Sequence, residues 1–147
     1  MIFRRATIED CNLLFEWANE PAVRQNSFNS EKIKYEDHVK WFENKISSPN
    51  CLIFICEDEG KPVGQIRIEK EENQGLINFS VDGNCRGKGY GKKMLEDIGE
   101  ALIQEKSGVT ELVGRVKPEN TASRKAFEGA RYSKIELSEF IEYNKKV

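Results

Sequence analysis

A glycine-rich segment, Arg86-Gly87-Lys88-Gly89-Tyr90-Gly91, has the residue types of a phosphate-binding loop. Glycines at alternate positions let successive backbone N–H groups point inward, where side chains would block the approach of a phosphate. A helix is expected to follow, and the N-terminus of a helix attracts anions. Arg86, Lys88 and Lys92 add positive charge. The pattern predicts a diphosphate site, although a glycine-rich connection without any ligand could carry the same glycines.

Two other kinds of phosphate loop fit this segment less well. A Walker A loop has the pattern G-x-x-x-x-G-K-[ST], whereas Gly91 is followed by Lys92 and Lys93 with no Ser or Thr next. A dinucleotide-binding loop has the spacing G-x-G-x-x-G at the first strand-to-helix turn. Here the spacing is G-x-G-x-G, and the segment comes late in the chain.

Apolar periodicity predicts which elements position this loop. We expect strands at residues 2–5, 51–56, 63–68, 76–81 and 109–116, helices from about residue 7 to Pro21 and at 35–46, 92–103 and 120–128, and room for two last strands at 133–143. Residues 23–34 are expected to form a loop with a short helical piece. A hairpin followed by a β-α-β unit indicates a mixed sheet with helices on both faces, an α/β (α+β) fold. Residues 1–147 are expected to form a single domain.

Composition narrows the class of ligand. The net charge of the 147 residues is −2, and the basic residues are spread along the chain, which does not favour a nucleic-acid partner. No apolar run approaches the length of a membrane span, and the first residues do not resemble a signal peptide. We therefore expect a small-molecule ligand, no membrane partner, and a monomer or homodimer.

The four cysteines are expected to be free thiols. None forms a C-x-x-C pair, and the chain has a single histidine, so we expect no metal site. Cys51 and Cys56 lie an odd number of residues apart in a predicted strand, so their side chains should point to opposite faces. Free thiols without a predicted signal peptide favour a cytoplasmic location.

The loop and its surroundings resemble those of the GNAT (Gcn5-related) acetyltransferases. Their motif A, Q/R-x-x-G-x-G/A, is satisfied by residues 86–91. The resemblance implies a mixed sheet of six to seven strands with about four helices, and acetyl-CoA as co-substrate with no metal. It implies cofactor contacts by three groups of residues: the strand Phe79, Ser80 and Val81, the loop Arg86, Gly87, Lys88, Gly89, Tyr90, Gly91 and Lys92, and the N-x-x-S-x-x-x-[YF] segment Asn120, Ser123 and Phe127.

Two positions depart from the family pattern. Many members have a tyrosine where this chain has Phe127, and they use it to protonate the leaving thiolate. Phenylalanine cannot donate that proton. Arg131 stands where glycine is usual. These departures leave a non-catalytic acetyl-CoA-binding domain as an alternative to an enzyme.

The expected reaction is attack of a neutral amine on a thioester, which needs an oxyanion donor and routes for two protons. Backbone N–H groups near residues 79–81 are the expected oxyanion donors. His38, Ser80 and Tyr132 are the candidate catalytic side chains: His38 as a base, Ser80 by ordering a water, and Tyr132 as a proton donor. His38 could equally bond a backbone carbonyl on a helix face, and Tyr132 could lie in the core.

The first third of the chain is similar to bacterial acetyltransferases that modify a 4-amino sugar carried on UDP, as in pseudaminic acid biosynthesis. The shared residues are Trp17, Asn19, Arg24, Asn26, Ser27, Phe28, His38 and Trp41. This resemblance implies that Arg24 binds phosphate or uracil, that Asn26 and Ser27 bind sugar hydroxyls, and that Phe28 or Trp41 stacks on a flat ring. The alternatives are that these residues are core or solvated, and that the acceptor is a peptide, protein or other small amine.

Overall fold

The computed structural model describes residues 1–147 as one seven-stranded sheet in the order β1-β2-β3-β4-β5-β7-β6. Strands β4 and β5 pair in parallel and all other neighbours pair antiparallel. The strands are β1 (Ile2–Arg5), β2 (Cys51–Asp58), β3 (Lys61–Glu71), β4 (Gln74–Val81), β5 (Glu111–Val116), β6 (Ser133–Glu136) and β7 (Ile141–Lys146). The predicted mixed sheet is confirmed.

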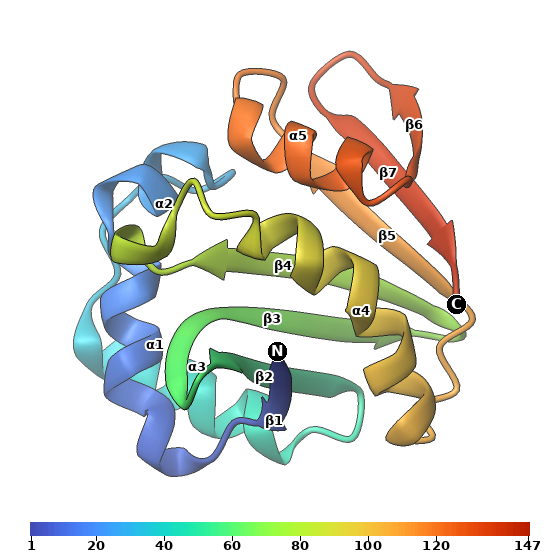
Figure 1. The fold of residues 1–147 in the computed structure, drawn as a ribbon. Helices are drawn as coiled ribbons and strands as arrows, with labels where there is room; N and C mark the ends of the chain where they lie inside the picture. Colours follow the sequence, from blue (N-terminus) through green and yellow to red (C-terminus); the bar gives the residue numbers. More distant parts are fainter.

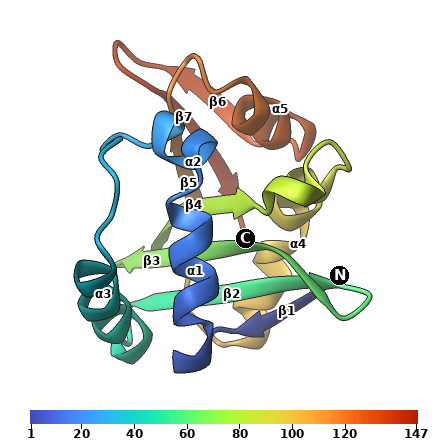
Figure 2. The same cartoon turned by 90° about the vertical axis from the view of Figure 1, so that its left-hand side faces the viewer.

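Helices cover both faces of the sheet. They are α1 (Cys11–Ala18), α2 (Pro21–Asn26), α3 (Tyr35–Ser47), α4 (Tyr90–Gln104) and α5 (Thr121–Gly129), with 3-10 turns at Ile8–Asp10 and Gly83–Cys85. Helix α4 crosses one face, and α5 lies on the same side over β5 and β7 (Figure 1). Helices α1 and α3 pack on the opposite face over β2 and β3 (Figure 2).

Each layer has its own apolar core. Eighteen buried residues form the larger cluster, which includes Phe54, Met94 and Phe127, and six form the smaller cluster, which includes Leu14 and Phe42. Cys51 belongs to the smaller cluster and Cys56 to the larger one, so their side chains do point to opposite faces of the sheet. All four cysteines are free.

The sheet opens between β4 and β5. Their register runs from Gln74 opposite Glu111 to Ile77 opposite Gly114 and then stops, although β4 continues to Val81 and stays paired with β3. Figure 1 shows the two strands meeting near the C-terminus of the chain and diverging toward α2 and α5. The second half of β4 therefore has a free edge inside the sheet.

The main differences from the sequence expectation lie in the short elements. Pro21 limits the first helix as expected, but it also begins α2, because a proline is well tolerated in the first turn of a helix. Helix α4 begins at Tyr90, inside the glycine-rich segment. None of the helices combines the length and the apolar character that a membrane-spanning segment requires.

Candidate active site

The glycine-rich loop joins the 3-10 turn after β4 to the start of α4. Gly87 and Gly89 have φ values of +78° and +82°, a region that favours glycine, and no protein atom lies within 4 Å of the position a β-carbon would take at either residue. None of the backbone N–H groups from Arg86 to Lys92 makes a hydrogen bond within the chain. A run of free N–H groups at a helix N-terminus, beside open space, can bind a diphosphate.

Cationic side chains surround this run of N–H groups. Lys88 and Lys92 form no ion pair, and the Lys92 chain extends along Gly129 of α5. Arg86 lies 3.2 Å from Glu20, between Nη2 and Oε2, and is about two-fifths exposed. All the predicted loop residues thus lie around one open patch at the start of α4.

Two hydrogen bonds hold the loop in place. Nε1 of Trp17 donates to Oδ2 of Asp82 at 2.7 Å, which ties α1 to the end of β4. The Tyr90 hydroxyl donates to Oδ2 of Asp58 at 2.6 Å, and this bond raises the pKa of Tyr90 to about 12. The structure therefore gives the Tyr90 side chain an anchoring contact with β2, and its backbone N–H remains available to a ligand.

The free edge of β4 presents backbone groups to the opening. The N–H of Asp82 donates to the carbonyl of Val63 at 2.8 Å, so Asp82 faces β3. Alternate residues of a strand direct their N–H and C=O groups to opposite neighbours. Phe79 and Val81 therefore direct theirs into the opening, where an extended amide chain could pair with them.

Ser80 points to the face of the sheet that carries α1 and α3. Its Oγ accepts a hydrogen bond from Nε2 of Gln65 at 3.3 Å, and the same Nε2 donates to Oδ1 of Asn78 at 3.1 Å. Gln65 is buried while Asn78 is exposed. Gln65 and Asn78 were not predicted as site residues, and only the register of β3 against β4 brings them beside Ser80.

His38 and Tyr132 are both buried, and each makes a hydrogen bond to a backbone carbonyl. Nε2 of His38 is 3.0 Å from the carbonyl oxygen of Cys11, its ring is stacked near Phe42, and burial lowers its pKa. The Tyr132 hydroxyl donates to the carbonyl of Leu95 at 3.0 Å, and burial raises its pKa. These arrangements match the structural alternatives for both residues and do not support a proton-transfer role.

The three predicted cofactor residues of α5 lie in two places: Asn120 and Ser123 at the start of the helix, and Phe127 in the core. Oδ1 of Asn120 accepts from the Ser123 N–H at 3.2 Å, which caps the helix. Phe127 is 2% exposed; its ring stacks on Tyr143 and presses on Gly114, where a β-carbon would lie 2.3 Å from Cζ. Phe127 also contacts Phe79 edge-on. It therefore supports the floor of the opening rather than lining it.

The segment predicted to bind the acceptor is largely bonded to itself. Nε of Arg24 donates to the carbonyl of Ala18 at 2.7 Å, Nη1 donates to the carbonyls of Asn29 and Glu31, and Nη2 donates to Ser27. Ser27 in turn donates to the Val23 carbonyl, and Nδ2 of Asn26 donates to the Ala22 carbonyl. This arrangement does not support Arg24 as a phosphate ligand, because its donors already organise the loop.

The two predicted aromatic residues are more accessible. Phe28 is 62% exposed and meets Phe140 of the β6–β7 turn edge-on, with ring centroids 6.2 Å apart. Trp41 of α3 is half-buried under the Arg67 guanidinium, 4.9 Å from its ring centroid. Phe140 was not predicted as a site residue, since no local pattern marks a residue so distant in sequence as a partner of Phe28.

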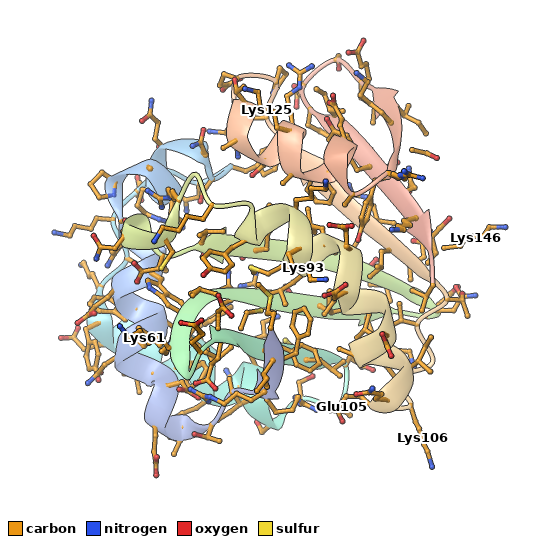
Figure 3. The ribbon with its side chains drawn as sticks, in the orientation of Figure 1. Lys61, Lys93, Glu105, Lys106, Lys125 and Lys146 are labelled. Carbon is orange, nitrogen blue, oxygen red and sulfur yellow. The ribbon has the colours of Figure 1, made fainter.

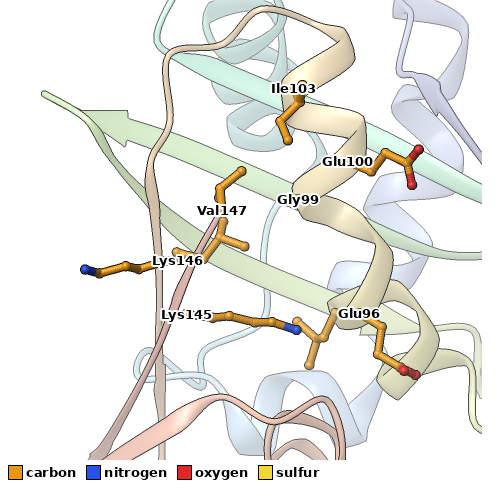
Figure 4. A pocket seen from close by; sticks show the side chains of 9 residues that line it. Glu96, Gly99, Glu100, Ile103, Lys145, Lys146 and Val147 are labelled. Carbon is orange, nitrogen blue, oxygen red and sulfur yellow. The ribbon is translucent and has the colours of Figure 1, made fainter.

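Other surface features lie apart from this opening. A cavity of about 180 Å³ lies between the second half of α4 and the end of β7, with Gly99, Ile103 and Val147 among its lining residues (Figure 4). Side chains such as Lys106, Lys125 and Lys146 project outward from the ribbon (Figure 3). No group of three His, Cys, Asp or Glu side chains is placed to hold a metal ion.

Comparison with known proteins agrees with this geometry. Residues 1–132 match the family described as "Acetyltransferase (GNAT) domain". No curated protein sequence matches the chain. Similar solved structures include the aminoglycoside acetyltransferase AAC(6')-Ib with paromomycin and acetyl-CoA (TM-score 0.83, 16% identity, 98% of this chain and 92% of that one). The ribosomal L7/L12 α-N-protein acetyltransferase RimL, solved with coenzyme A, is also similar (TM-score 0.83, 12% identity, 99% of this chain and 93% of that one). So is a domain from Methanocaldococcus jannaschii (TM-score 0.82, 22% identity, 99% of this chain and 97% of that one). At these identities the structural likeness shows the fold.

Proposed function

We propose that this chain, which belongs to the acetyltransferase (GNAT) domain family and is an acetyl-CoA-dependent N-acetyltransferase, transfers the acetyl group to a 4-amino sugar carried on UDP. This choice of acceptor rests on the resemblance of the first third of the chain to sugar-nucleotide acetyltransferases. Among the similar structures, one is solved with an aminoglycoside and another is an α-N-acetyltransferase of a ribosomal protein, so the fold accommodates both kinds of amine.

The observation that carries the transferase assignment is the pairing of two features. The free N–H groups of residues 86–92 suit a diphosphate, and the free edge of β4 at Phe79 and Val81 suits an amide-containing arm. Coenzyme A has both parts in one molecule. Lys88 and Lys92 stay unpaired for the phosphates, and Asn120 and Ser123 stand at the start of α5 beside the loop's helix.

Acetyl-CoA supplies the acetyl group as a reactive thioester. We propose that the backbone N–H of Phe79, which lies farther from the phosphate loop than Val81, stabilises the negative charge that develops on the thioester oxygen, while Val81 pairs with the amide-containing arm. The acceptor amine then attacks the thioester carbonyl directly in a ternary complex, and the coenzyme A thiolate leaves. The two substrates are held together by the protein, which lowers the entropic cost of the attack.

Proton handling is assigned to Ser80 among the three predicted side chains. Ser80 is half-buried on the free half of β4, so it can order a water beside the amine. His38 and Tyr132 are assigned supporting roles, since their polar atoms already bond backbone carbonyls. The thiolate leaves without a tyrosine donor in this proposal.

The residues predicted to bind the acceptor fall into two groups, one that shapes the loop and one that can contact the acceptor. Arg24, Asn26 and Ser27 hold the loop in shape through bonds to backbone carbonyls. Phe28 and Trp41 present aromatic surface, Phe28 at the border of the opening and Trp41 on the same face of the sheet.

Release of the coenzyme A thiol with a panel of amines tests this function. The panel holds a UDP-linked 4-amino sugar, the same sugar without the nucleotide, an aminoglycoside and peptides with free N-termini. We expect the highest kcat/KM with the sugar nucleotide. Faster turnover of peptides would show that the acceptor is a peptide and not a sugar nucleotide. Absence of thiol release with all of these amines would favour a non-catalytic acetyl-CoA-binding domain.

A further inference from the structure

Side chains of the diverging strands β4 and β5 lie beside the opening, on the face of the sheet opposite α4 and α5. Gly114 of β5 faces Phe127 of α5, so the next residue, Arg115, faces the other side of the sheet. In the same way, Phe79 of β4 packs toward α5, so Ser80 faces the other side. Arg115 follows the last residue of β5 that pairs with β4. Its guanidinium is thus carried by the strand that borders the opening, on the same face as Ser80 and Asn78.

Arg115 belongs to a three-residue cluster that joins distant parts of the chain. Its guanidinium carbon lies 5.7 Å from the ring centroid of Phe140, and the Phe140 ring meets Phe28 edge-on. Nε of Arg115 also lies 3.3 Å from Glu142, while the side chain remains half exposed. Nη1 and Nη2 of Arg115 have no partner in the chain, so they can serve an anion.

We propose that Arg115, with the Phe28–Phe140 pair, forms the recognition site for the nucleotide part of the acceptor. The free fork of the Arg115 guanidinium binds a phosphate of a nucleoside diphosphate, and the exposed Phe28 ring stacks on the flat base. The inference rests on the proposed function, because it places the amino sugar between this site and Ser80.

The chemistry of the cluster favours this ligand over an amine-rich one. A polyamine acceptor is positively charged and would need carboxylates to bind it, whereas this site presents a guanidinium. The nearby carboxylate of Glu142 is already paired with Arg115. Arg24 cannot fill the same role, because all its nitrogen atoms already donate within the loop. A planar guanidinium under an aromatic pair suits a ligand that combines a phosphate with a flat ring.

The test compares Arg115→Gln with Arg5→Gln. Arg5 is a matched control on β1: it pairs with Glu105 at 3.3 Å, lies 5.8 Å from the ring centroid of Phe54 and has a side chain about as exposed as that of Arg115. Binding of UDP to the acetyl-CoA-loaded protein is measured by calorimetry. We expect Arg115→Gln to weaken UDP about tenfold or more, as for the loss of a hydrogen bond to a charged group, and Arg5→Gln to leave it unchanged.

Turnover gives a second readout. Arg115→Gln should raise the KM for the UDP-linked amino sugar by a similar factor and leave the KM for acetyl-CoA and for the sugar without the nucleotide unchanged. Phe28→Leu should weaken UDP about threefold, whereas Phe28→Tyr keeps the ring and the affinity.

The outcomes separate the inference from the proposed function. UDP binding that is lost in Arg115→Gln, without turnover of any sugar nucleotide by the unaltered protein, would uphold the site and refute the acceptor assignment. UDP that does not bind the unaltered protein, or that binds Arg115→Gln and Arg5→Gln equally well, overturns the inference.

Discussion

Nη2 of Arg86 lies 3.2 Å from Oε2 of Glu20, so the first basic residue of the phosphate loop is paired with an acid at the junction of α1 and α2. Oε1 of Glu20 also lies close to Gly83, only 2.3 Å from the position that a β-carbon would take there. The carboxylate thus sits against the turn that leads into the loop. A diphosphate on the loop would share Arg86 with it and would meet a like charge.

Replacing Glu20 by Gln should therefore tighten acetyl-CoA. The change removes a like charge near the diphosphate and frees Arg86, and a partly exposed ion pair of this kind is worth ~0.2–1 kcal/mol, or up to about fivefold in affinity. Calorimetry with acetyl-CoA measures it. Glu16→Gln, one turn earlier on α1 and without an ion pair, is the control and should change nothing. An affinity for acetyl-CoA that is the same in Glu20→Gln as in the unaltered protein would contradict this account.

Replacing Gly89 by Ala should reduce affinity for acetyl-CoA ~tenfold or more, because a methyl group enters the space beside the free N–H groups at φ +82°. The strain of a left-handed alanine also costs ~1–2 kcal/mol of stability. Gly108→Ala is a matched control, with φ +77° at the far end of α4 and only the flexible Lys70 amine nearby. Both variants should lose similar stability by thermal unfolding. Equal acetyl-CoA affinity in both would disprove the loop assignment.

Phe127→Leu should lower the free energy of unfolding by ~1–2 kcal/mol and leave the shape of the pH–rate profile unchanged. The reason is that Phe127 is a core residue packed on Tyr143 and Gly114, with no proton to give. Phe54→Leu, at the same 2% exposure in the same cluster, is the comparison for stability. Disappearance of the basic limb of the profile in Phe127→Leu alone would contradict this account.

Asp10 links stability to pH. Arg4 donates to both of its carboxylate oxygens at 2.8 Å and the Thr7 N–H donates to one of them, and the Arg4 bonds lower the pKa of Asp10 below its ordinary value of 3.8. A lowered pKa means that this stabilisation is present above the unfolded-state pKa and is lost as pH falls through the folded-state value.

Asp10→Asn should therefore cost ~1–3 kcal/mol of unfolding free energy at neutral pH. The difference from the unaltered protein should shrink as pH falls from about 5 to about 2. Urea unfolding at a series of pH values measures it, with Glu9→Gln, an exposed acid in the same turn, as the control. A difference that stays constant down to the lowest pH would argue against the ion pair as its source.

The phosphate loop and the sheet could be read from the sequence, because both depend on local pattern. The glycine spacing predicted a loop whose Gly87 and Gly89 do adopt positive φ, and strand alternation placed Cys51 and Cys56 on opposite faces. The glycine that is usual at the position of Arg131 has a local explanation, because the φ there is +67°, a value that glycine adopts without strain.

The side-chain roles could not be read in the same way. Whether Arg24 meets a ligand depends on where the carbonyls of Ala18, Asn29 and Glu31 lie, and the loop's fold brings all three to it. Likewise, Phe28 meets Phe140 only because the turn after β6 reaches the loop after α2. Residue type predicts which bonds a side chain can form, whereas tertiary packing decides which bonds remain free.

The crystal structure of the protein with acetyl-CoA is the most direct test of the central claim. We predict the diphosphate on the N–H groups of residues 86–92, the pantetheine arm along the free edge of β4 with hydrogen bonds to Val81, and the thioester oxygen at the N–H of Phe79. The thioester should then lie in the opening between β4 and β5, on the side of Ser80. Acetyl-CoA bound elsewhere, such as in the cavity between α4 and the end of β7, with an unoccupied opening, would contradict the account.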